Sequence, residues 1–192
     1  MADEDQYDLL TPFKDMDLVR LLVADLHDDL PGKVARFRQL AELSRVLGTG
    51  GTMMPGGETS WASWTEARTS FIHGNYVATV LLCQGLAEHM LAAQLSLGIN
   101  GEELPSRVSF HDTLLRCLAR DLITPKDADD LRRLMNLRNP LSHYRSIDDP
   151  SNLSRRALDT MSPAEIHLRG DASFAISMAV RLLALPAFRL GD

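Results

Sequence analysis

Residue types suited to phosphate chemistry stand close together in residues 138–143, which read RNPLSH. Arg138 offers a planar, permanently charged guanidinium that matches a phosphate. His143 offers an imidazole that can give or take a proton near neutral pH, and Asn139 offers an amide that could position that ring. Cleavage of RNA by its own 2′-hydroxyl needs a base, an acid and stabilisation of charge in the transition state. These three residues could supply the base, the acid and the stabilising charge without a metal.

The same residues also have a purely structural interpretation. Arginine and histidine near the end of a helix often hydrogen-bond to the last carbonyls and complement the negative end of the helix dipole. A short motif has a high false-positive rate, so its spacing alone does not decide between the two interpretations.

The geometry of the motif depends on Pro140. Residues five apart on a straight helix lie about 140° apart around the axis, so Arg138 and His143 would not share a face. Proline lacks an N–H and kinks or breaks a helix, and it pushes Asn139 away from helical angles. We therefore expect a kink that brings Arg138 and His143 toward one cleft, with Asn139 as N-cap if the helix resumes at Pro140.

Apolar residues at three- and four-residue spacing through the chain predict an all-α fold with no sheet of three or more strands. Leu and Ala dominate the apolar residues, which also favours helix. The expected helices cover 15–29, 34–47, about 61–73, 76–98, 109–120, 125–138 and 164–185. The polar stretch 146–163 is expected to be a loop, with room for a short helix.

Proline and glycine between the expected helices divide the chain into three predicted segments. Residues 1–47 form an acidic extension whose two helices could pair as a hairpin around Pro31-Gly32. Residues 48–60, GTGGTMMPGGETS, read as a linker or mobile loop. They lack the Gly-Lys-Ser/Thr ending of a phosphate loop and no strand precedes them. Residues 61–192 form the helical bundle, and Thr59 or Ser60 is the expected cap of its first helix.

The helix over 76–98 is apolar almost all round, so we expect it to be the central buried helix, ended by Gly98. Glu88 lies within it. An ionised carboxylate is costly to bury unless it is paired, so we expect Glu88 within hydrogen-bonding reach of Arg138 or another motif residue. The neighbouring His89 has no second ligand at metal spacing, and the pattern predicts no metal site.

Charge is unevenly distributed in this chain of net charge −6. Residues 1–30 hold nine acidic and two basic side chains, so the remaining residues are nearly neutral. This balance argues against a broad DNA-coating surface but leaves room for an RNA-binding cleft. Cys83 and Cys117 lie in apolar helical patterns and are expected to be free, buried thiols. No signal peptide and no run of about 18 apolar residues is present, so we expect a cytoplasmic protein without a membrane partner.

Residues 60–188 resemble the HEPN superfamily of helical-bundle proteins. The resemblance consists of a long apolar helix with an internal Glu, a loop, a short helix, a helix ending in Arg-Asn-x-x-x-His, and a final packing helix. Its specific part is Arg138, Asn139 and His143. The surrounding Leu-Arg-Asn-Pro-x-x-His-Tyr-Arg adds Tyr144 and Arg145 as auxiliary residues, together with Glu88. The family implies an up-and-down bundle of four to five helices that usually dimerises, with the motifs of both subunits in a shared cleft.

Two functions follow from the motif and the resemblance. Many members of the family are metal-independent endoribonucleases, often toxins or defence effectors. For this chain the resemblance implies RNA as substrate, no cofactor, and an antitoxin or other protein partner. It also implies a homodimer in which two His143 rings divide the acid and base roles. Other members have lost catalysis and bind RNA, nucleotide or protein. The motif favours the enzyme, whereas weak overall basicity and few exposed aromatic residues favour the binding module. The acidic extension lies outside the resemblance.

Overall fold

The structure, a computed structural model, describes residues 16–97 and 101–190. These residues form an all-α protein, as predicted, in which two very short strands are the only sheet. The helices are α1 (Met16–His27), α2 (Leu30–Ser44), α3 (Gly57–His73), α4 (Tyr76–Ser96), α5 (Phe110–Ala119), α6 (Pro125–Ser142), α7 (Leu153–Thr160) and α8 (Ala164–Leu183). The strands are β1 (Gly51–Thr52) and β2 (Arg189–Leu190), and single 3-10 turns cover Arg45–Leu47 and Pro186–Phe188.

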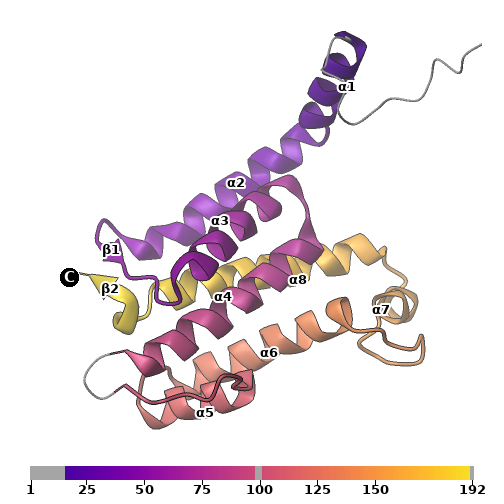
Figure 1. The fold of residues 1–192 in the computed structure, drawn as a ribbon. Coiled ribbons are helices and arrows are strands. Elements are labelled where there is room, and N and C mark those ends of the chain that lie inside the picture. Colours follow the sequence, from indigo (N-terminus) through magenta and orange to yellow (C-terminus); the bar gives the residue numbers. More distant parts are fainter. Residues whose placement is uncertain (1–15, 98–100, 191–192) are drawn as a thin grey trace, which may run out of the picture.

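Helix α4 is the centre of the bundle, with α3, α5, α6 and α8 packed around it (Figure 1). Its apolar side chains are buried on several sides, among them Cys83, Leu86, Met90, Leu91 and Leu95. Within the described residues α4 is also the one helix long and apolar enough to cross a membrane. Its place in the core accounts for that composition, because a helix covered by neighbours all round needs apolar residues all round.

Several helix ends lie where the sequence predicts them. Thr124 caps α6 in a reciprocal capping box with Asp127, and Pro125 takes the first helical position. The Ser109 hydroxyl accepts the N–H of Asp112 at the start of α5. Gly74 separates α3 from α4 at φ 81°, a left-handed angle that suits glycine. Helix α4 ends at Ser96, and Gly98 lies outside the described residues.

The predicted N-terminal hairpin is wrong. Helix α1 projects from the first turn of α2, away from the bundle, and does not fold back along α2 (Figure 1). Pro31 lies in the first turn of α2, where a missing N–H costs nothing, so it starts this helix instead of separating two helices. Asp29 is the N-cap at φ 47°, and its carboxylate accepts the N–H of Gly32 at 3.2 Å.

Helix α2 packs on α3 and α8, so the bundle uses part of the segment expected to be an extension. Leu40 is 3% exposed and belongs to the core. The buried Arg36 donates through Nε to the carbonyl of Ile72 at 2.9 Å and pairs with Asp29 at 2.9 Å. These contacts fix the start of α2 to the end of α3.

The glycine-rich residues 48–56 are tied to the bundle. β1 pairs antiparallel with β2, with Gly51 opposite Leu190 and Thr52 opposite Arg189, and the Met53 N–H donates to the carbonyl of Phe188 at 2.7 Å. Helix α3 begins at Gly57, before the expected caps, because Gly56 at φ 93° takes the N-cap position. A Cβ at position 56 would lie 3.2 Å from the carbonyl oxygen of His89, so only glycine allows this close approach.

Candidate RNA-cleavage site

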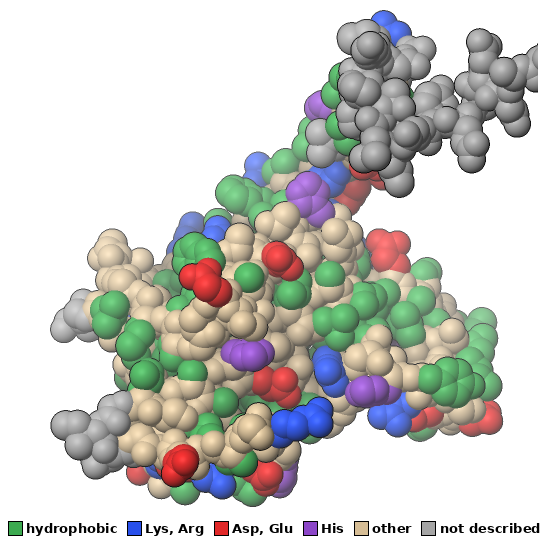
Figure 2. Space-filling view, in the orientation of Figure 1, with side chains coloured by type: hydrophobic (Ala, Val, Ile, Leu, Met, Phe, Trp, Pro, Cys, Tyr) green, Lys and Arg blue, Asp and Glu red, His purple; other side chains and the backbone are tan. Residues whose placement is uncertain are grey.

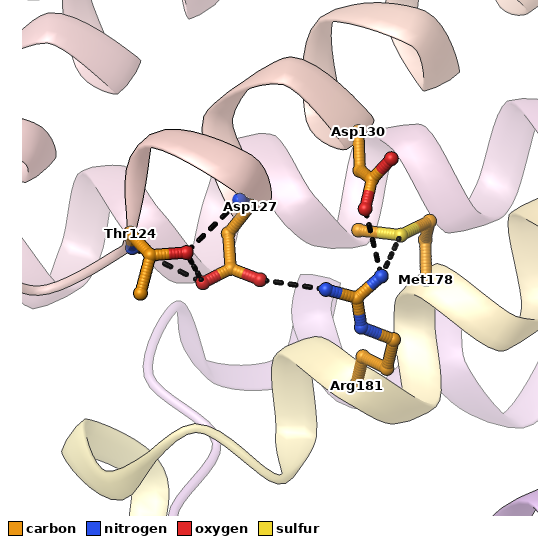
Figure 3. A network of polar contacts seen from close by, with 5 residues as sticks. All are labelled: Thr124, Asp127, Asp130, Met178 and Arg181. Carbon is orange, nitrogen blue, oxygen red and sulfur yellow. Dashed lines mark hydrogen bonds and ion pairs between the residues drawn. The ribbon is translucent and has the colours of Figure 1, made fainter.

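Helix α6 carries the motif, and two polar clusters on α8 hold α6 and the following helix α7 in place. At its start, the Arg181 guanidinium donates to Asp127 and Asp130, each at 2.8 Å (Figure 3). Near the other end of α6, Arg156 of α7 donates two hydrogen bonds, of 2.6 and 3.1 Å, to the buried carboxylate of Asp171 of α8. The second cluster anchors the segment that follows the motif. Neither arginine could be identified from spacing in the sequence, since the contacts join residues far apart in the chain.

Helix α6 does not break at Pro140. It continues to Ser142, with Pro140 in its last turn. Only two further helical residues follow the proline, so few hydrogen bonds depend on it. The Ser142 hydroxyl lies 3.3 and 3.4 Å from the carbonyls of Arg138 and Asn139, and the His143 N–H donates to the Asn139 carbonyl at 3.0 Å. These contacts satisfy carbonyls at the helix end.

Arg138 and His143 nevertheless meet. Nη1 of Arg138 lies 3.3 Å from Nε2 of His143. The cause is the helix end and not a kink, because His143 is the C-cap with extended angles of φ −129° and ψ 137°. Its side chain therefore leaves the helical path and turns back to Arg138. Within the described residues no carboxylate pairs with Arg138, so its charge remains available to an anion.

Asn139 has a different place from the one expected. It lies inside α6 as a helical residue, so its predicted N-cap role is wrong. Its side chain makes no hydrogen bond with the part of the chain that the structure describes, and its backbone carbonyl is its contact with His143. Asn139 is half-buried beside the pair.

The two residues after the motif are in solvent. The Tyr144 side chain is 93% exposed. Arg145 is exposed, and its Nε lies 3.9 Å from the Asp149 carboxylate, while its carbonyl accepts from the Asn152 side chain at 2.9 Å. An exposed aromatic ring and a guanidinium whose one ion pair is long thus lie next to His143, where they could stack on a base and pair with a phosphate.

Glu88 lies away from the motif, contrary to the prediction. It lines a hollow of about 250 Å³ together with His89, Arg107 and residues of α5, and it makes no ion pair or hydrogen bond with a motif residue among the described residues. The reason is helix direction. Helices α4 and α6 run antiparallel, so the motif lies beside the first turn of α4, whereas Glu88 lies in its second half (Figure 1). Glu88 is half-buried and needs no partner there.

Two hollows flank the motif end of the bundle. One of about 410 Å³ lies between α6 and the segment before α7, lined by Arg133, Asn136, Leu137, Pro140, Pro150, Ser151 and Arg156. Arg133 stacks on the ring of Phe174 with Cζ 4.1 Å from the centroid. The other, of about 580 Å³, lies between the first turns of α4 and α8 and is mostly apolar. Residues 133, 136, 137 and 140 follow one another at helical spacing on one face of α6. This spacing is the signal from which the sequence could have indicated the hollow of about 410 Å³.

Metal and thiol chemistry have little basis in the described residues. No group of three His, Cys, Asp or Glu side chains comes together there as a metal site would require. Cys83 and Cys117 are free and buried. Burial raises the pKa of the Cys83 thiol far above its ordinary value and that of Cys117 to about 12, so both remain protonated and unreactive.

Comparison of the chain with protein-family models, with curated proteins and with solved structures gave no match.

Proposed function

We propose that this protein is a metal-independent endoribonuclease in which Arg138 and His143 act on one phosphodiester. The observation that carries the proposal is the 3.3 Å contact between the guanidinium and the imidazole at an open helix end. Arg138 binds the scissile phosphate and stabilises the charge that develops on it. His143 takes the proton of the 2′-hydroxyl or protonates the leaving oxygen.

One imidazole cannot be acid and base in a single concerted step, so the proposal includes a homodimer. A two-fold axis would place two copies of α6 end to end and supply the second His143 without any further sequence. The apolar hollow beside the first turn of α4 is at the same end of the bundle, next to the exposed Val77. That apolar surface supports a subunit contact there.

Substrate binding would use the exposed side chains next to the pair. Tyr144 would stack on a base next to the cleavage point and Arg145 would pair with a neighbouring phosphate. An RNase of this kind fits a cytoplasmic toxin or defence effector, whose protein partner would cover the open motif. Binding of RNA without cleavage, by the same Tyr144 and Arg145, is the second candidate because these two side chains need no catalytic pair.

The test is one labelled RNA incubated with the purified protein, with and without EDTA, and with the product ends mapped. Attack by the 2′-hydroxyl leaves a 2′,3′-cyclic phosphate and spares both DNA and RNA that is methylated at the 2′-oxygen. Activity that disappears in EDTA and returns with Mg²⁺, or products ending in a 3′-hydroxyl, would overturn the mechanism. RNA binding without any cleavage would favour the second candidate.

A further inference from the structure

Helix α1 is an arm that exposes several apolar side chains. Val19, Leu22 and Val23 recur at three- and four-residue spacing and are 39%, 56% and 46% exposed. A lone helix of 12 residues is marginal in water and gains most of its stability by packing an apolar face. The arm therefore needs a surface to pack on.

The direction of the arm is fixed by contacts at its base. The Asp29 carboxylate both caps α2 and pairs with Arg36, and Arg36 is in turn held by the carbonyl of Ile72. Lys33 Nζ donates to the carbonyl of Asp25, in the last turn of α1, at 3.4 Å. Only Asp28 and Asp29 lie between the two helices. These contacts hold α1 pointing away from its own α2.

Helix α2 has a matching uncovered stripe. Leu30, Val34 and Phe37 are 46%, 42% and 56% exposed and follow one another at helical spacing. They lie beside the face of α2 that carries the buried Arg36 and Leu40. Figure 2 shows hydrophobic and basic side chains along α2. The stripe from Leu30 to Ala41 is as long as α1, about 18 Å at 1.5 Å per residue.

The two segments that carry these surfaces have opposite net charge. Residues 16–29 hold four carboxylates and one arginine, whereas residues 30–47 hold four basic side chains and one glutamate. The net charges are −3 and +3. Arg38 is exposed beside the apolar stripe, and Arg45 is exposed in the 3-10 turn that follows α2. An acidic amphipathic helix therefore matches this stripe in shape, length and charge, and α1 is such a helix.

We propose that the occupant of the α2 stripe is α1 of a second copy of this chain, exchanged about a two-fold axis through residues 28–29. Two α1–α2 rods then lie antiparallel, so that Val23 of one copy faces Val34 of the other. Two-fold symmetry makes the same contact twice. The arm leaves the bundle beside Tyr76, which Arg36 contacts, at the end where α6 also finishes. The partner therefore lies beyond the end of the molecule that carries the motif.

The proposal stands apart from the proposed catalysis, and cysteine cross-linking of the full chain tests it. Val23→Cys and Val34→Cys are made on separate chains of different tag length, mixed, and oxidised. The expected product is a covalent heterodimer of the two tags, formed well above the level given by either variant alone. Ala35→Cys, exposed on α2 but off the stripe, is the matched control in place of Val34→Cys. Equal cross-linking with Ala35→Cys, or no heterodimer, would overturn the exchange.

Two further measurements keep the test decisive. Phe37→Glu, at an exposed position, should abolish the cross-link between Val23→Cys and Val34→Cys when it is added to the Val34→Cys chain, while leaving the circular dichroism spectrum unchanged. A chain that carries both cysteines and forms only an internal disulfide in a monomer would mean that α1 folds back on its own α2, against the proposal. His143→Ala should leave the heterodimer yield unchanged, so failure of the RNase assay and failure of the exchange are told apart.

Discussion

The guanidinium of Arg138 and the imidazole of His143 lie 3.3 Å apart through Nη1 and Nε2, although the two residues would face different ways on a continuous helix. Arginine has donors only, so a hydrogen bond between these atoms requires that Nε2 carry no proton. The proton of the neutral ring is then on Nδ1. In this form the ring nitrogen next to the Arg138 guanidinium is the one able to accept a proton.

The tautomer of His143 is a direct test of this contact. Nitrogen-detected NMR at pH 8 should show the Nδ1–H form of this ring, and Arg138→Leu should remove that preference because the donor is gone. His111, exposed on α5 at the other end of the bundle, provides an internal comparison and should not respond. An Nε2–H ring in the native protein would contradict the hydrogen bond.

Loss of the imidazole should abolish proton transfer. We expect His143→Ala to lower the RNA-cleavage rate by about 10²–10⁴-fold, with unchanged binding of the RNA at equilibrium. Arg138→Lys should also lose activity although it keeps the positive charge, since lysine lacks the planar fork that matches a phosphate. His111→Ala is the matched control and should cleave at the native rate. Native activity of His143→Ala would eliminate the assigned role.

The pair of Arg156 and Asp171 should hold α7 in place. The Asp171 side chain is 9% exposed, so Asp171→Ala leaves a partly buried guanidinium without its partner. Hydrogen bonds to charged groups contribute about 1.5–3 kcal/mol each. Because the Arg156 side chain is 27% exposed and water can replace part of the lost pair, unfolding in urea should show a loss near the value of one such bond, about 2–3 kcal/mol. Asp159→Ala removes the exposed partner of Arg155 and should leave the unfolding midpoint nearly unchanged. Equal effects of the two variants would contradict the burial argument.

Asp127 should make stability depend on pH in the acid range. Partial burial raises the pKa of this carboxyl, but hydrogen bonds from Thr124 and the charge of Arg181 outweigh burial and hold it below its ordinary value of 3.8. A pKa that is lower in the folded protein stabilises it above the unfolded value and loses that contribution as pH falls through the folded value. Asp127→Asn should therefore destabilise the protein at pH 7, and the difference from the native protein should shrink below about pH 4.

Thr124→Ala provides the companion measurement to Asp127→Asn. It removes the hydroxyl that caps α6 and donates to Asp127, and loss of such a cap costs about 1 kcal/mol. Denaturant unfolding at pH 7 and at pH 3 measures both variants. An Asp127→Asn protein as stable as the native one at pH 7 would be inconsistent with the network in Figure 3.

Signals from neighbouring residues predicted the helices. The features that these signals did not predict depend on tertiary contacts or on where a helix ends. The capping box at Thr124 and the left-handed Gly74 each depend on a few neighbouring residues, so the sequence contains the whole cause. Pro140 shows the limit of such reasoning. It was expected to break α6, but its effect depends on how many helical residues follow it, and only two do. The same residue type at position 31 begins a helix.

The features of the candidate site also have either local causes, which the sequence contains, or tertiary causes, which it does not show. The meeting of Arg138 and His143 follows from residues within one turn, and the sequence suggested it, although the cause is the extended C-cap and not a kink. The position of Glu88 depends on the relative direction of α4 and α6, which spacing within one helix cannot give. Arg156 and Asp171 are 15 residues apart on separate helices, so no periodicity marks them as partners.

The pairing of β1 with β2 has a consequence for the order of folding. Arg189 Nη1 donates to the Thr52 hydroxyl across 137 positions of the chain, whereas helices form from neighbours. Closing so long a loop has an entropic cost that grows with its length, and contacts that are distant in sequence slow folding. This two-residue ladder should therefore close after the helices have formed. Protection of the Met53 amide proton, which donates to the carbonyl of Phe188, should lag behind the amides of α4 in pulse-labelled refolding.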